Sequence, residues 1–156
     1  MRALVQRVNH ASVTVMPEPG TQTPPHVSGS IDRGLLVLLG VGKEDGDEQA
    51  ARLWSKISRL RIFEDEAGKT NRSLADVGGA VLVVSQFTLY ADCRRGNRPS
   101  FTAAGAPDEA RRLYKTFCEL VRADLGDVQT GEFGAYMRVE LENDGPFTVW
   151  LDTDEL

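Results

Sequence analysis

The chain contains few of the side chains that enzymes most often use as nucleophiles, bases or metal ligands. Its 156 residues include two histidines, His10 and His26, and two cysteines, Cys93 and Cys118, which show neither metal-site spacing nor a disulfide framework. The sequence has no Gly-x-Ser-x-Gly elbow, no phosphate-binding loop and no His-Glu-x-x-His pair. We therefore expect no metal, no cofactor and no side-chain triad, and we expect any catalysis to depend on backbone groups and on the substrate.

The sequence also lacks an excess of positive charge and a long hydrophobic run. Its net charge is −5, so any contact with RNA needs a local basic patch. No run could span a membrane, and residues 1–7 alternate like a strand instead of forming the apolar core of a signal peptide. We expect a cytoplasmic protein whose chain, with 41% hydrophobic residues, forms a single domain over residues 1–156.

Alternating and continuous hydrophobic patterns predict several strands. They are expected at residues 2–8, 11–16, 35–41, 80–89, 137–142 and 147–151. The runs at 35–41 and 80–89 are continuously apolar at first, which is typical of strands buried on both faces. We expect a tight turn at Asn9-His10 and a hairpin closed by residues 143–146, since Asp-Gly is a strong hairpin signal. The Pro-rich segment 17–26 is expected to be an exposed surface loop.

Two amphipathic helices complete the predicted fold. Asp45 and Glu48 resemble a capping box, and the second helix starts near Pro107 with acidic residues in its first turn. Their apolar faces comprise Ala50, Leu53, Trp54 and Ile57 in the first helix, and Ala110, Leu113, Tyr114, Phe117 and Val121 in the second. The pattern predicts a mixed α/β domain. Two helices can cover only one side of a sheet with this much apolar surface, so we expect a barrel-like curl or a dimer to hide the rest.

The best site candidate is Ser85-Gln86-Phe87-Thr88-Leu89, where an apolar strand suddenly turns polar. Such a break in patterning is expected at functional sites, although a strand leaving the core would also explain it. Ser85 or Thr88 could be a nucleophile, but no base is evident in the sequence. Backbone N–H groups near the strand end could instead stabilise an oxyanion.

Two further segments are open to more than one interpretation. Gly145-Pro146 could present rigid, bare backbone, but this stretch alone favours an ordinary turn. Residues 94–101, Arg-Arg-Gly-Asn-Arg-Pro-Ser-Phe, form either a loop that contacts phosphates or a solvated loop.

Together, Ser85-Gln86-Phe87-Thr88-Leu89 and residues 143–148, Asn-Asp-Gly-Pro-Phe-Thr, resemble the signature pair of D-aminoacyl-tRNA deacylases. The resemblance runs nearly end to end and includes residues 6–8, 34–41, 60–63, 96–101 and 131–137. The chain departs from the family pattern in two places. Phe147 stands where the family usually has Val, and the Pro-rich loop is longer than expected. The first departure changes the side chain directly after the proline.

The resemblance implies a homodimer with a curved, barrel-like sheet that hydrolyses the ester between a D-amino acid and the 3′-terminal adenosine of tRNA. It implies a cis Gly145-Pro146 bond, with this dipeptide of one subunit reaching into the pocket of the other. There it rejects L-amino acids, which is proofreading by exclusion. Glycine has no side chain to reject, so we expect glycyl-tRNA, including glycine mischarged onto the tRNA for alanine, to be cleaved as well.

The resemblance also assigns roles to individual residues. Ser85, Gln86, Phe87 and Thr88 correspond to the catalytic segment, in which backbone amides of Phe87 and Thr88 stabilise the oxyanion and the substrate 2′-hydroxyl assists water. Arg7 and Asn143 support the Gly-Pro segment, and Phe133 and Met137 lie near the terminal adenine. For Phe133 and Met137, packing in the core is an alternative.

Three other functions compete with this interpretation. A related deacylase has a trans Gly-Pro bond and removes L-alanine from tRNA, but its strand motif differs from Ser-Gln-Phe-Thr. A non-enzymatic nucleic-acid-binding protein conflicts with the acidic net charge. An esterase for small molecules would need a side-chain nucleophile, and none is evident.

Overall fold

The computed structural model describes all residues, 1–156, and is built around one six-stranded sheet. Its strands are β1 (Arg2–Val15), β2 (His26–Ile31), β3 (Gly34–Gly40), β6 (Ala80–Ser85), β7 (Gln129–Thr130) and β8 (Met137–Asp152). The strand order is β2-β1-β3-β6-β7, and β8 pairs with β1. Strand β1 is antiparallel to all its partners, whereas β3, β6 and β7 are parallel to one another.

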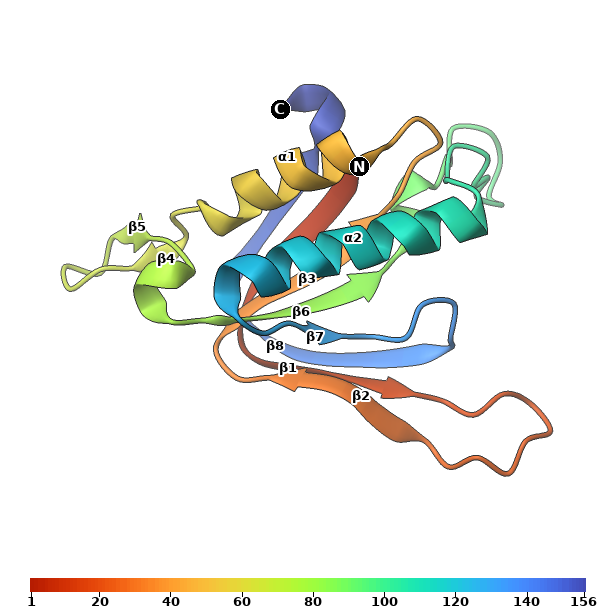
Figure 1. Ribbon diagram of the computed structural model, residues 1–156, viewed down its shortest axis with the longest axis horizontal. Helices are drawn as coiled ribbons and strands as arrows, with labels where there is room; N and C mark the ends of the chain where they lie inside the picture. The colour runs from red at the N-terminus through yellow and green to blue at the C-terminus, as the bar shows by residue number, and fades with distance from the viewer.

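Two long helices lie on one side of this sheet (Figure 1). Short strands and 3₁₀ turns lie between the helices and the long strands along the chain. The helices are α1 (Asp47–Ser58) and α2 (Pro107–Leu125). A small sheet pairs β4 (Phe63–Glu64) with β5 (Thr70–Arg72), and single 3₁₀ turns form η1 (Ala75–Val77), η2 (Phe87–Tyr90) and η3 (Thr153–Glu155). No helix has an apolar stretch long enough to cross a membrane.

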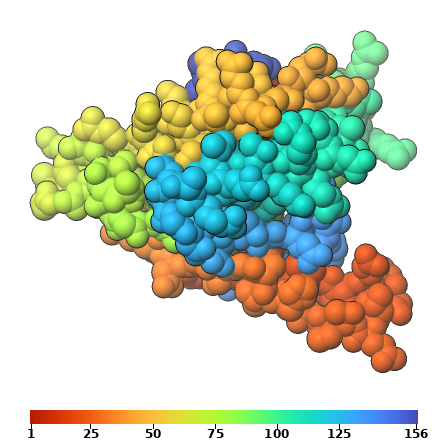
Figure 2. Space-filling model, viewed as in Figure 1, coloured from red at the N-terminus to blue at the C-terminus, as the bar shows by residue number.

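The sheet curls until its two ends approach each other. Gly29 of β2 faces the backbone of β7, and a methyl group at this glycine would lie 2.7 Å from the carbonyl oxygen of Thr130. A glycine is therefore required for the close approach. The resulting domain is a mixed α/β fold with a nearly closed, barrel-like sheet, which confirms the predicted fold class. The loop of residues 17–25 between β1 and β2 projects from the body of the molecule, as predicted for the Pro-rich segment (Figures 1 and 2).

The two faces of the curled sheet support separate cores. The larger core lies between the sheet and the helices, and the smaller one fills the barrel interior. In β3, Leu35, Val37 and Leu39 belong to the larger core, whereas Leu36 belongs to the smaller one. Burial on both faces explains the continuous apolar run of this strand, as the sequence predicted.

The two predicted hairpins at the ends of the chain are wrong. Strand β1 continues through Asn9-His10, and β8 continues through residues 143–147. The long strands pair along their whole length, with Gln6 opposite Thr148 and Val8 opposite Asn143. The extra residues of β8 therefore form a bulge, and Gly145 adopts a φ of +128° there. A turn signal such as Asp-Gly is compatible with a hairpin and with a bulge. The bulge forms here because the partner strand β1 pairs with β8 on both sides of it.

Two boundaries also differ from the prediction. The second buried strand ends at Ser85 instead of Leu89, because residues 87–90 form η2. Helix α1 begins after Gly46, whose N–H donates to the Gln49 side chain at 2.9 Å, so Asp45 and Glu48 do not form the capping box. Asp45 instead accepts from the N–H of Gly42 at 2.5 Å.

Candidate active site

The polar end of β6 forms an abrupt turn with two free backbone donors. The N–H of Gln86 donates to the carbonyl of Leu39 at 2.7 Å, which ends the strand pairing, and η2 follows at once. Within the turn, the N–H of Leu89 donates to the carbonyl of Gln86 at 3.2 Å. The first N–H groups of a helical turn have no partner inside it. The N–H groups of Phe87 and Thr88 are therefore available to a ligand.

Two glycines let this turn lie directly on the end of β3. A methyl group at Gly40 would lie 3.1 Å from the Cβ of Leu89, and one at Gly42 would lie 2.7 Å from the hydroxyl oxygen of Tyr90. Cβ atoms in proteins essentially never lie as close to another atom as the 2.7 Å found for Gly42. A side chain at position 42 must therefore displace the turn. The Gly-x-Gly spacing of Gly40 and Gly42 is the sequence signal that could have indicated this arrangement.

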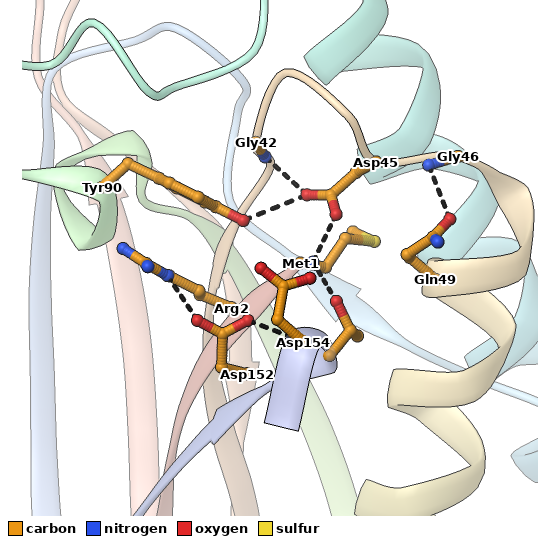
Figure 3. Close-up of polar contacts among 10 residues, drawn as sticks. Met1, Arg2, Gly42, Asp45, Gly46, Gln49, Tyr90, Asp152 and Asp154 are labelled. Carbon is orange, nitrogen blue, oxygen red and sulfur yellow. Dashed lines mark hydrogen bonds and ion pairs between the residues drawn. The ribbon is translucent and has the colours of Figure 1, made fainter. Parts of the chain in front are cut away.

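Arg2 holds the turn from the neighbouring strand. Its Nη1 donates to the carbonyl of Leu89 at 3.1 Å, and its Nε donates to the Asp152 carboxylate at 2.7 Å. The guanidinium also lies 4.3 Å from the centroid of the Tyr90 ring. Figure 3 shows Arg2 between Asp152 and Tyr90. One side chain thus joins both terminal strands to η2.

Asp45 secures the same turn from the other side (Figure 3). Its Oδ2 accepts from the Tyr90 hydroxyl at 3.1 Å, and its Oδ1 pairs with the amino group of Met1 at 2.5 Å. Burial, reinforced by the Asp45 carboxylate, raises the pKa of Tyr90 well above its usual value. The phenol therefore stays a neutral donor, and its hydrogen bond to Asp45 persists at physiological pH.

A cavity of about 280 Å³ opens beside the turn and brings several predicted site residues together. Ser85, Gln86 and Phe87 line one side, and Phe133 and Met137 line another. Phe133 packs against Tyr114 with ring centroids 5.8 Å apart. Phe133 and Met137 are therefore not confined to the core, which was the alternative for both residues.

Thr88 is the predicted catalytic residue that does not line this cavity. Its side chain is exposed and hydrogen-bonds to the Gln86 amide. Phe87 is 56% exposed and packs edge-on against Phe101 with ring centroids 5.0 Å apart. The contact places the Arg-rich loop that ends in Phe101 next to the turn.

The residues that line the cavity are all uncharged. Among its lining residues there is no histidine, cysteine or carboxylate, and Ser85 has no base beside it there. No group of three or more His, Cys, Asp or Glu residues in the chain could hold a metal ion. The arrangement can bind a flat apolar group and offer backbone donors to a developing negative charge.

The Gly145–Pro146 segment forms the crest of the β8 bulge, and the peptide bond between these residues is cis. Both residues are exposed. Beneath them, Arg7 is only 5% exposed, and it donates to the carbonyl of Asp144 at 3.2 Å and to that of Ile62 at 2.6 Å. Arg7 also pairs with the Asp144 carboxylate at 2.9 Å.

Asn143 closes the base of the bulge. Its Nδ2 donates to the carbonyl of Arg7 at 3.0 Å and to that of Phe147 at 2.9 Å. Phe147 packs against the larger core, with its ring 5.2 Å from the Arg7 guanidinium. The departure at position 147 thus leaves the crest of Gly145 and Pro146 unobstructed.

Within one chain, the bulge and the cavity lie apart. Neither Gly145 nor Pro146 lines the cavity. Ser85 is in register with Leu39, whereas the bulge lies across β1 from Gly34, which pairs with Ala80. At ~3.3 Å per residue, the five steps from Ala80 to Ser85 separate the two places by roughly 16 Å along the strands.

The chain matches known proteins over almost its full length. The family model described as "D-Tyr-tRNA(Tyr) deacylase" matches residues 4–152. The D-aminoacyl-tRNA deacylase of Thermomicrobium roseum is 57% identical over 158 residues, covering 100% of this chain and 96% of its own. That of Thermosipho melanesiensis is 52% identical, covering 100% of this chain and 99% of its own.

Two solved structures have the same fold as this chain. A chain titled "c-Myc DNA Unwinding Element Binding Protein" superposes with a TM-score of 0.86 at 41% identity, covering 97% of this chain and 98% of its own. A probable eukaryotic D-amino acid tRNA deacylase superposes with a TM-score of 0.81 at 19% identity, covering 96% of this chain and 97% of its own. The second likeness supports the fold alone.

Proposed function

Since this chain belongs to the D-aminoacyl-tRNA deacylase family and is a hydrolase of D-aminoacyl-tRNA, we propose that its η2 cavity holds the ester while the bulge of a second copy excludes L-amino acids. The observation that carries this proposal is the pair of free N–H groups of Phe87 and Thr88, on a turn fixed at the cavity wall. Ser85 and Gln86 shape the wall beside that pair.

Backbone donors suit this reaction because an aminoacyl ester is already activated. Water adds to the carbonyl carbon, and the carbonyl oxygen takes the negative charge under the two N–H groups. The ester bond then breaks, and the proton lost by water reaches the departing 3′-oxygen of the ribose by way of the neighbouring 2′-hydroxyl. No base from the cavity wall is needed. One such backbone donor is typically worth ~3–4 kcal/mol of the barrier.

The apolar side of the cavity suits the terminal adenine. Phe133 presents an aromatic ring there, and Met137 adds a polarizable side chain. A base stacked on these residues would bring its ribose, and the attached ester, toward the turn at residues 87–88. The single-stranded 3′ end of tRNA can supply an unstacked base of this kind.

Selection between D- and L-amino acids requires rigid backbone at the α-carbon of the substrate. A carbonyl pressed against that carbon admits hydrogen and excludes a methyl group, and such exclusion can exceed the ~1–3 kcal/mol gained by fitting one methylene. Gly145 and Pro146 are exposed, bear no flexible side chain and are held from below by Arg7 and Asn143. Because they do not line their own cavity, we assign them to the cavity of the partner in a homodimer.

Glycyl-tRNA and L-alanyl-tRNA differ by one methyl group and therefore test the exclusion directly. The purified protein should deacylate glycyl-tRNA, including glycine mischarged onto the tRNA for alanine, because glycine carries hydrogen at both positions. It should leave L-alanyl-tRNA intact, with rates at least 100-fold apart when release of radiolabelled amino acid is followed. Comparable rates on both substrates would rule out steric exclusion at the α-carbon.

A further inference from the structure

Arg111, which has no part in the proposed reaction, lies beside the wall of the cavity proposed for the adenine. The guanidinium of Arg111, on α2, is 4.8 Å from the centroid of the Phe133 ring. A methyl group at Gly134, which also lines the cavity, would lie 3.8 Å from the Nη2 atom of Arg111. Arg111 is itself exposed. Its charge therefore lies at the protein surface, beside two residues of the cavity wall.

The neighbouring arginine on the same helix shows what Arg111 lacks. Arg112 donates to Asp47 at 2.7 Å and to Glu109 at 2.6 Å, and these carboxylates neutralise its charge. Arg111 takes part in no ion pair and no side-chain hydrogen bond of the structure. Its guanidinium instead makes a cation–π contact with the Phe133 ring. In a chain with a net charge of −5, Arg111 is therefore a cation without an ion-pair partner beside the cavity proposed for the 3′ end of tRNA.

The terminal nucleotide of tRNA carries such an anion beside its base and ribose. We propose that Arg111 binds the phosphate joining the terminal adenosine to the preceding nucleotide, with its guanidinium stacked on Phe133. This inference rests on the proposed placement of the adenosine between Phe133 and Met137. A planar guanidinium can stack on a ring and still direct its edge N–H groups at phosphate oxygens. The phosphate contact fixes the position of the 3′ end without reading its sequence.

Two substrates, one with and one without the phosphate, distinguish phosphate binding by Arg111 from a role of Arg111 in holding the Phe133 ring. Arg111→Gln should raise KM for D-tyrosyl-tRNA about tenfold and leave kcat unchanged. It should have no effect on 3′-D-tyrosyladenosine, which has no phosphate. The dependence of log kcat/KM on log salt should also become less steep by ~0.7, the value for one phosphate contact on a single strand. Arg112→Gln, the matched control, should leave both substrates and the salt dependence unchanged.

A binding measurement tests the same site without catalysis. By NMR titration, the wild-type protein should bind adenosine 5′-monophosphate about tenfold more tightly than adenosine, and Arg111→Gln should abolish the difference. Equal binding of both ligands to the wild type would overturn the phosphate site, even if D-tyrosyl-tRNA is hydrolysed. An equal loss on tRNA and on tyrosyladenosine in folded Arg111→Gln would also overturn it, since Arg111 would then act only through Phe133.

Discussion

Gly42→Ala is expected to lower kcat for D-tyrosyl-tRNA about 100-fold, with little change in KM. The added methyl group would lie 2.7 Å from the Tyr90 hydroxyl oxygen and 2.8 Å from two ring carbons, so the Tyr90 ring must move. Tyr90 is part of η2, and its displacement tilts the N–H groups of Phe87 and Thr88 away from the oxyanion. A 100-fold loss corresponds to ~2.7 kcal/mol, which is at the low end for losing one donor. Steady-state kinetics at 25 °C would measure both constants.

Two variants control for this prediction. Gly46→Ala places its methyl group no nearer than 3.5 Å to any neighbour, so it should retain its kcat. Thr88→Ala should keep substantial activity, because that side chain is exposed and outside the cavity. Full activity in folded Gly42→Ala would contradict a positional role for η2. Complete loss in folded Thr88→Ala would instead favour a threonine nucleophile.

Arg7→Ala is expected to lower the preference for D- over L-tyrosyl-tRNA at least 100-fold. The buried guanidinium bonds to the carbonyls of Asp144 and Ile62 and pairs with the Asp144 carboxylate. Without it, the bulge bearing Gly145 and Pro146 can recede, so an L side chain is tolerated. The cavity residues lie elsewhere, so hydrolysis of the D-substrate should continue. The initial rates on the two substrates give the ratio directly.

The same variant should be less stable. Leaving a buried carbonyl without its charged partner costs about 3 kcal/mol, which is roughly 10 °C in Tm for a domain of this size. Rates should therefore be measured at 20 °C, with folding verified by circular dichroism. Arg138→Ala removes an exposed arginine that has no acidic partner on β8, and it should change neither ratio nor stability. An unaltered D-to-L ratio in folded Arg7→Ala would refute the support role.

The sequence predicted the elements better than their connections. The helix around Pro107 begins at that residue, and the apolar run at 35–41 is a strand buried on both faces, because these patterns depend on local periodicity. The pairing of β1 with β8 joins residues far apart in the chain, from Val15 with Met137 to Arg2 with Asp152. No local signal encodes such a pairing, so the bulge was interpreted as a hairpin.

For the proposed site, a break in patterning pointed to the Ser85–Thr88 segment, and resemblance to the family suggested Arg7 and Asn143. The supports of the turn were missed because they are ordinary residues in sequence. Arg2 lies in an alternating strand, and Asp45 was assigned to a helix cap. Their roles arise only because the fold brings strand ends and a loop to the same turn (Figure 3).

The proposed specificity depends on Gly145-Pro146 as a steric barrier to L-amino acids. The most direct measurement is the deacylation of D-tyrosyl-tRNA and L-tyrosyl-tRNA by the wild-type protein, side by side under identical conditions. Steric exclusion predicts rapid release of D-tyrosine and an L-tyrosine rate no higher than that without protein. Release of L-tyrosine beside inert D-tyrosyl-tRNA would contradict it.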